Sequence, residues 1–217
     1  MIRHHLNDAL LMGYSAGQLP EAFNLIVATH ISMCDECRAR LESFDAVGGA
    51  LLSGATIDAP EQVMKNDSLA QVLARIRQAP PEMPARSKPK RGVFPAPLRD
   101  YVGGDLDAVR WRAVGGGVRQ AILPTARDAS ARLLFIPGGV AVPDHGHRGT
   151  ELTLVLKGAF RDEVDRFGPG DIEIATEELE HTPIAEPGED CICLVVTDAP
   201  LRFSGLVPRL LQPFLKI

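Results

Sequence analysis

A proline-rich segment divides this chain of 217 residues into two parts of different character. Six prolines fall between residues 79 and 97. Proline fixes φ and lacks a backbone N–H, so this stretch should hold no helix and disfavours strand. We therefore predict a basic linker at 81–100 between a domain at 1–80 and a domain at 101–217. The chain is long enough for two domains of ordinary size.

Residues 1 to about 80 have the apolar spacing of helices. Pro20 suits the first turn of the second helix, which is expected to be long. The Gly48-Gly49 pair disfavours its continuation. Asp67 or Ser68 can cap a further helix. The three apolar stripes are, in order, Leu6, Leu10, Leu11 and Tyr14; Phe23, Ile26, Val27, His30, Cys34, Cys37 and Leu41; and Leu69, Val72, Leu73 and Ile76.

After about residue 100 the sequence changes to short apolar runs separated by Gly and Pro. Strands are expected at 118–123, 130–136, 151–157, 159–164, 171–174 and 190–197. Many short strands with such turns indicate an all-β sandwich or barrel. The segment from Leu206 to Leu215 could form a short helix packed on it.

The first half contains a group of residues suited to a metal. His30, Cys34 and Cys37 are spaced four and three apart, so on one long helix they share a face. His5 or His4 on the first helix can supply the fourth ligand; adjacent helical residues point about 100° apart, so only one can face the metal. Two His and two Cys suit Zn²⁺. The alternative is that both cysteines are small buried apolar residues.

A second group lies between the expected strands. His145 and His147 share a face of an extended segment, Glu151 opens the next strand, and His181 follows thirty residues later. Three imidazoles and a carboxylate can bind Zn, Mn, Fe, Ni or Cu, and the ligand types alone do not choose among them. The alternative is a set of unrelated surface histidines.

Cys191 and Cys193 lie two apart in an apolar strand and therefore share a face. This spacing is poor for a mutual disulfide but good for lining one pocket. They are candidates for redox sensing, and the alternative is two buried core residues.

Charge and hydropathy restrict the environment and the partners. The formal net charge of −5 argues against direct nucleic-acid binding. No apolar run reaches the ~18 residues of a membrane span, and the opening residues lack a signal-peptide core. A cytoplasmic, non-membrane protein is expected, and in a reducing compartment paired Cys near His indicate metal or redox chemistry.

Both groups resemble known families. The upstream His with H-x3-C-x2-C resembles the zinc-binding anti-sigma domain family, which implies that His5, His30, Cys34 and Cys37 bind zinc. That family binds extracytoplasmic-function sigma factors. The second group matches the first metal motif of the cupin superfamily. Pro169-Gly170-Asp171 and His181 match its second motif loosely, with Ala185 where that motif often has Asn.

The order of the two motifs resembles the ChrR-type anti-sigma family over nearly the whole chain. The matching stretches include residues 2–5, 28–40 and 45–49 and the Cys191-Ile192-Cys193 run. The resemblance implies a zinc-bound helical domain that inhibits a sigma factor and a cupin domain required for the response to singlet oxygen. It also implies a regulator rather than an enzyme.

Two other functions are compatible with the motifs. A metal-dependent cupin dioxygenase or isomerase would use open metal positions, although no separate acid–base residue is identifiable. The second of these alternatives is a purely structural or metal-storage protein. Residues 1–80 carry a net charge of −3, which can complement a basic protein partner.

Overall fold

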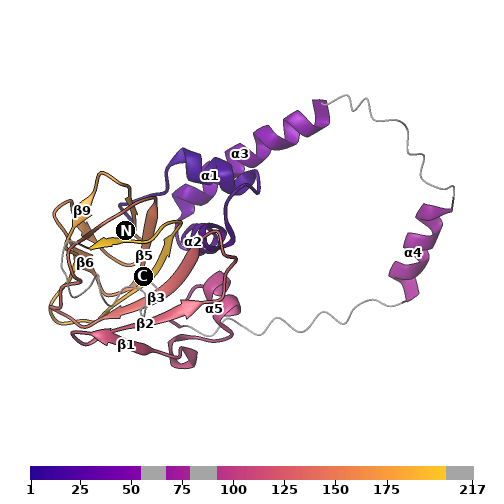
Figure 1. The fold of residues 1–217 in the computed structure, drawn as a ribbon. Helices are drawn as coiled ribbons and strands as arrows, with labels where there is room; N and C mark the ends of the chain where they lie inside the picture. Colours follow the sequence, from indigo (N-terminus) through magenta and orange to yellow (C-terminus); the bar gives the residue numbers. More distant parts are fainter. Residues whose placement is uncertain (55–66, 79–91, 204–217) are drawn as a thin grey trace. The chain divides into compact units, whose positions relative to one another are not determined.

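The computed structural model describes residues 1–54, 67–78 and 92–203 (Figure 1). Residues 1–48 and the described residues from Gly92 onward form one compact unit, and 49–91 belong to a second. The domain boundaries at 80 and 100 stay a prediction because most of the expected linker lies outside the described residues. The expected helix at 206–215 also lies outside them.

Helices occupy the first part of the chain, as predicted. They are α1 (Asp8–Ser15), α2 (Glu21–Ile31), α3 (Asp35–Gly54) and α4 (Ser68–Gln78). Two further helical elements, α5 (Ala96–Val102) and the 3₁₀ turn η1 (Leu106–Ala108), follow in the expected linker and at the start of the second part. Within the described ranges, no helix is both long and apolar enough to cross a bilayer.

The prediction of one long second helix was wrong. The chain turns between α2 and α3, where the Ser32 hydroxyl donates to the Thr29 carbonyl (2.7 Å). The sulfur of Cys34 then accepts from the N–H of Cys37 (3.4 Å) and satisfies a donor in the first turn of α3. The helix continues through Gly48-Gly49 to Gly54, contrary to expectation.

The prolines of the linker were also expected to exclude helix, yet α5 begins among them. Pro95 is its N-cap and Pro97 lies in its first turn. A missing N–H costs nothing there, because first-turn N–H groups have no partner within the helix.

The second part of the chain is an all-β cupin barrel, as predicted. Its strands are β1 (Arg112–Gly115), β2 (Val118–Leu123), β3 (Ser130–Ile136), β4 (His145–Gly146), β5 (Glu151–Lys157), β6 (Phe160–Arg161), β7 (Arg166–Phe167), β8 (Ile172–Ala175), β9 (Glu180–His181), β10 (Ile184–Ala185), β11 (Cys191–Thr197) and β12 (Arg202–Phe203). An antiparallel sheet in the order β1-β2-β3-β11-β5-β8 faces two small sheets, β10-β6-β7 and β12-β4-β9.

Five of the six expected strands occur within one residue of their predicted ends. The run 159–164 forms strand only at Phe160–Arg161. It turns at Asp162, whose carboxylate accepts from the backbone N–H groups of Val164 and Asp165. This local hydrogen bonding competes with the sheet and ends the strand.

Strand β11 is buried on both faces. Ile192, Leu194 and Val196 belong to the core that includes the N-terminal helices. Cys193 and Val195 point to the other side, into a second core inside the barrel. The sheet therefore separates the helices from the barrel interior.

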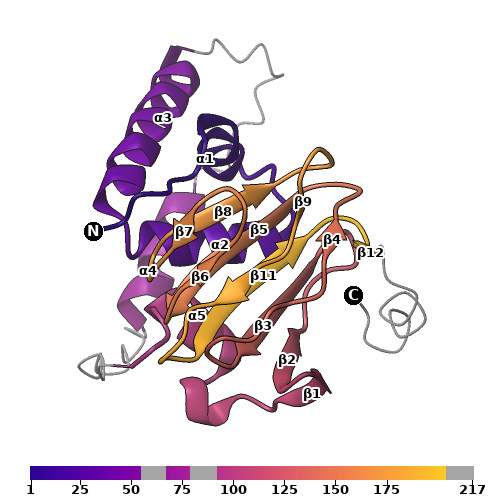
Figure 2. The ribbon, with the colours of Figure 1, turned by 90° about the vertical axis from the view of Figure 1, so that its left-hand side faces the viewer.

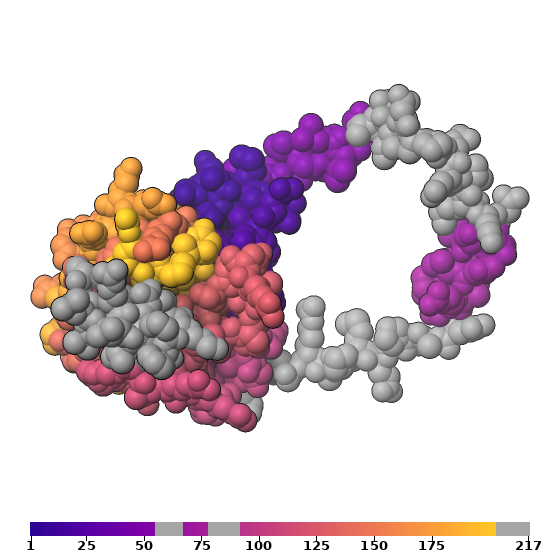
Figure 3. All heavy atoms as spheres, viewed as in Figure 1, coloured from indigo at the N-terminus to yellow at the C-terminus, as the bar shows by residue number. Residues whose placement is uncertain are grey.

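Helix α2 lies on the outer face of this sheet. It contacts β11, β5 and β3, and also α5. Figure 2 shows α2 crossing β5 and β11, and Figure 3 shows the N-terminal residues against the strands. His30 is part of α2, so this packing places the helical metal group next to the barrel.

Replacing Leu194 with alanine should destabilise the chain by about 2–5 kcal/mol, because its buried side chain fills the interface between sheet and helices. Urea unfolding measures the change. The control is Ile122→Ala on β2, whose side chain is 42% exposed and whose loss should cost about 0.5 kcal/mol or less. Equal effects of the two substitutions would contradict this account of the core.

Candidate metal centres

The structure brings together the four residues of the helical group. His5 precedes α1, His30 is in α2, Cys34 lies in the turn and Cys37 is in α3. The ligands therefore come from separate elements rather than from one helical face. His5 Nδ1 lies 3.3 Å from Cys34 Sγ and 3.6 Å from Cys37 Sγ, and His30 Nε2 lies 3.3 Å from Cys37 Sγ.

These distances fit a tetrahedral metal. Zn²⁺ lies about 2.0 Å from nitrogen and about 2.3 Å from sulfur, so tetrahedral ligands N and S are about 3.5 Å apart. The set joins the segment before α1 to α2, to α3 and to the turn between them, and binding free energy would then stabilise their packing.

His4 points away from this group. Its Nε2 lies 3.1 Å from an oxygen of Asp165, and its ring contacts Phe167 with centroids 4.4 Å apart. Of the two candidate histidines, only His5 is directed at the two cysteines and His30.

Burial sets the protonation of the group in the absence of a metal. It lowers the pKa of His30 to about 4, with the nearby His5 acting in the same direction, so the imidazole is neutral and ready to ligate. Burial also raises the pKa of Cys37 to about 11. Metal binding must therefore displace the Cys37 proton at neutral pH.

His5→Ala should remove the metal of the helical group and leave that of the barrel, whereas His4→Ala should retain both. Elemental analysis of the purified variants measures the loss. His147→Ala, which should lose only the barrel metal, distinguishes the two sites. Retention of both metals by His5→Ala would show that His5 is not a ligand.

The second predicted group lies inside the barrel. His145 is in β4 with His147 just after it, Glu151 opens β5 and His181 ends β9. All four side chains are buried. The three imidazole rings approach one another with centroids 4.8–5.3 Å apart. His147 Nε2 and His181 Nε2 are 3.3 Å apart, the separation of two nitrogens about 2.0 Å from one tetrahedral metal.

Hydrogen bonds outside this group orient two of its imidazoles. His145 Nδ1 lies 2.8 Å from the Pro143 carbonyl, and His181 Nδ1 lies 2.9 Å from Asp162 Oδ2. If each Nδ1 carries the proton, each Nε2 is left as the ligand atom. The ring orientations therefore fit a bound metal.

Two acidic residues not identified from the sequence complete the barrel site. Glu173 Oε1 lies 3.1 Å from His181 Nδ1, on the same side as Asp162. Burial raises the pKa of Glu173 to about 7. Burial opposes the charging of His181, but Glu173 and Asp162 outweigh it and raise the pKa of His181 to about 9. A metal must therefore displace a proton from this imidazole.

Glu173 had one sequence signal, which is a charged residue inside an apolar strand. Asp162 had none, because only the turn that ends β6 places it beside His181.

Asp162→Asn should lower the metal affinity of the barrel by about 10–100-fold, because a neutral amide orients His181 less strongly. Competition with a chelator measures the affinity. Glu178→Gln is the control, since Glu178 is exposed. Unchanged affinity in Asp162→Asn would show that Glu173 alone suffices.

The two cysteines of the barrel, Cys191 and Cys193, are buried and lie close together in space. Their sulfurs are 3.5 Å apart. The neighbouring Cys191 and burial raise the pKa of Cys193 well above its usual value. Because the thiolate is the reactive form, Cys193 is protected in this conformation. A sensing role for the pair stays a prediction.

The fold and the two sites define a cupin barrel joined to a helical module held by histidine and cysteine side chains. A family model described as the ChrR cupin-like domain matches residues 100–200. The chain is 63% identical over 217 residues to the anti-sigma-E factor ChrR of Cereibacter sphaeroides, covering 100% of this chain and 99% of that protein. The chain belongs to the ChrR family of anti-sigma factors.

A solved structure agrees with this assignment. The crystal structure of Rhodobacter sphaeroides SigE in complex with the anti-sigma ChrR matches with a TM-score of 0.77 and 61% identity, covering 91% of this chain and all of that one. The family is one of regulators, so the alternative of a cupin dioxygenase or isomerase is set aside.

Proposed function

We propose that this chain binds and inhibits an extracytoplasmic-function sigma factor in the cytoplasm and releases it on an oxidative signal, singlet oxygen or a related species, received by the cupin domain. The observation that best supports this proposal is the solved structure of ChrR, which is 61% identical to this chain, in complex with SigE.

Two helices each carry exposed apolar side chains that such a partner would cover. Helix α4 has an apolar face that is exposed along its length, and the second half of α3 adds further apolar side chains. These residues are Leu69, Val72, Leu73 and Ile76 on α4, and Val47, Leu51 and Leu52 on α3. Exposed apolar side chains along one face of a helix are typical of protein-binding surfaces, and this applies to each of the two helices separately. The net charge of −3 over residues 1–80 would favour association with a basic partner.

We assign Zn²⁺ to His5, His30, Cys34 and Cys37, because two thiolates and two imidazoles suit it best. In the barrel, His145, His147, Glu151 and His181 would hold Zn²⁺ or another divalent ion such as Mn, Fe or Ni. Each metal would fix the side chains that bind it. The chain's own hydrogen bonds and packing connect the two sites.

The segment from Asp162 to Asp171 supports communication between the sites. At its start, Asp162 contacts His181 of the barrel group. Three residues on, Asp165 contacts His4, which is adjacent to His5 of the helical group. A displacement of His181 would move Asp162, and this short segment would pass the movement on to Asp165 and its contact with His4.

The end of the same segment holds the chain leading into α1. One oxygen of Asp171 accepts from the backbone N–H groups of Arg3 (2.6 Å) and His4 (3.0 Å). The N–H of Ile172 donates to the His4 carbonyl (3.3 Å). A shift of the segment would therefore alter the hydrogen bonds that hold Arg3 and His4 to the barrel. It would thereby shift the helical module between a form that binds the sigma factor and a form that does not.

His5→Ala should abolish inhibition of transcription by the cognate sigma factor, because the helical module loses its metal. His147→Ala should inhibit normally but fail to release the sigma factor under photosensitised singlet oxygen. Transcription in vitro with purified polymerase, with and without illumination, measures both properties.

Glu178→Gln serves as the matched control and should inhibit and release like the unmodified chain. Normal release by His147→Ala would contradict sensing at the barrel site. Normal inhibition by His5→Ala would separate the helical metal from sigma binding.

A further inference from the structure

The barrel contains a cavity beside its metal-binding group. Its volume is about 360 Å³, within the range of small-molecule sites. His145, Glu151 and His181 line one side. The rest of the wall is mainly aliphatic and includes Val118, Leu134, Ile136, Val142, Val195 and Leu201.

A buried arginine also lines this cavity. Arg132 lies on β3 beside Val195 of β11 and is only 5% exposed. Within the described residues, its one recorded hydrogen bond goes from Nη2 to the Ser130 hydroxyl at 3.2 Å. A guanidinium has five N–H donors, so its hydrogen-bonding capacity is largely unused there.

The charge of Arg132 is also incompletely balanced. Burial lowers its pKa, and the charge of Glu151 acts against this effect. Glu151, however, belongs to the metal-binding group, so a bound cation would compete for its charge. Burying a charged group is costly unless it is paired, which favours an anion beside Arg132.

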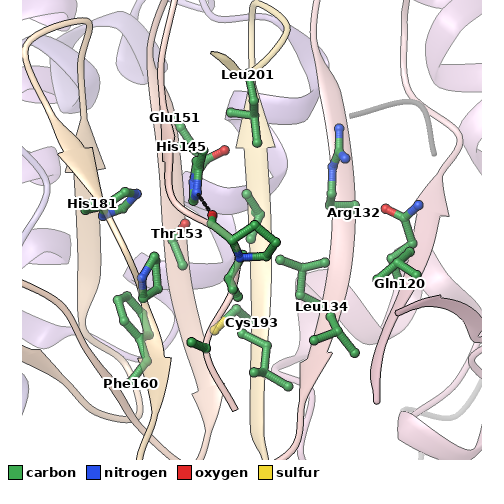
Figure 4. Close-up of a pocket in the computed structure, with 18 of the residues that line it drawn as sticks. Gln120, Arg132, Leu134, His145, Glu151, Thr153, Phe160, His181, Cys193 and Leu201 are labelled. Atoms are coloured by element: carbon green, nitrogen blue, oxygen red, sulfur yellow. Dashed lines mark hydrogen bonds and ion pairs between the residues drawn. The ribbon is translucent and has the colours of Figure 1, made fainter. Parts of the chain in front are cut away.

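The cavity is polar at one end and apolar at the other. Figure 4 shows the Arg132 guanidinium and the Glu151 carboxylate toward the same end, with Leu134, Cys193 and Phe160 farther along. Such a cavity fits a ligand with one anionic group and an aliphatic chain. The volume of the cavity lies at the small end of the range for small-molecule sites, which suits a ligand about the size of decanoate.

We propose that the cavity is a binding site for medium-chain carboxylates, with the carboxylate paired to Arg132 and the chain lying along the aliphatic wall. Arg132 and Leu201 also line an open groove beside the cavity, which offers a route for entry. This proposal deepens the proposed sensing function by naming a ligand class for the cupin domain.

Calorimetric titration of the full, metal-loaded chain with decanoate tests the site without measuring sigma release. Decanoate should bind, and Arg132→Gln should weaken it about tenfold or more through loss of the charged pair. The control variant Arg119→Gln should bind decanoate normally, because Arg119 does not line the cavity. Its Cζ instead lies 3.8 Å from the centroid of the Phe135 ring. Decanol, which lacks the charge, should bind equally to the unmodified chain and to Arg132→Gln.

A second variant keeps the test decisive if Arg132→Gln fails to fold. Leu134→Phe should fill the apolar end, so decanoate should be lost while butanoate still binds. The proposal is overturned if decanoate does not bind, if Arg132→Gln binds it normally, or if Leu134→Phe binds it normally. It is also overturned if His147→Ala, without the barrel metal, loses decanoate completely, because the carboxylate would then sit on the metal. Failure of signal-dependent release with intact decanoate binding would count against the proposed function alone.

Discussion

Burial of β11 on both faces is the constraint on which the rest of the molecule depends. Leu194 and its alternate neighbours hold α2 against the barrel, while Cys193 and Val195 form part of the barrel interior. A slip of one residue would exchange the two faces and disrupt both. The position of the helical metal group and the shape of the barrel cavity are therefore set by one strand register.

The two metal groups have different relations to the fold. The helical group joins His5, His30 and two cysteines from separate short elements, so metal binding and folding are linked there. In the barrel group only Glu151 lies on the six-stranded sheet, whereas His145 and His181 pair on the short strands β4 and β9. Asp162 and Glu173 orient His181 from outside the group. The first arrangement suits a structural clasp, whereas the second lies inside a barrel that the six-stranded sheet already holds together.

Much of the fold could be predicted from local sequence patterns. Short apolar runs between Gly and Pro turns predicted β2, β3, β5 and β11, and the His and Cys spacings selected both groups that the structure brings together. The break between α2 and α3 was missed because it depends on hydrogen bonds of Ser32 and Cys34. Asp162 could not be identified as a site residue, because only the turn after β6 places it beside His181. Arg132, like Glu173, had no sequence signal beyond being a charged residue inside an apolar strand.

The first residues of the chain also pair with β8, the edge strand of the six-stranded sheet. Strand β8 is the last in the six-stranded order, and its Ile172 N–H is satisfied by the His4 carbonyl. Unpaired strand edges invite association with other chains. Loss of this contact would leave the edge of β8 unpaired, so a form of the chain in which the opening residues had detached would be more prone to self-association.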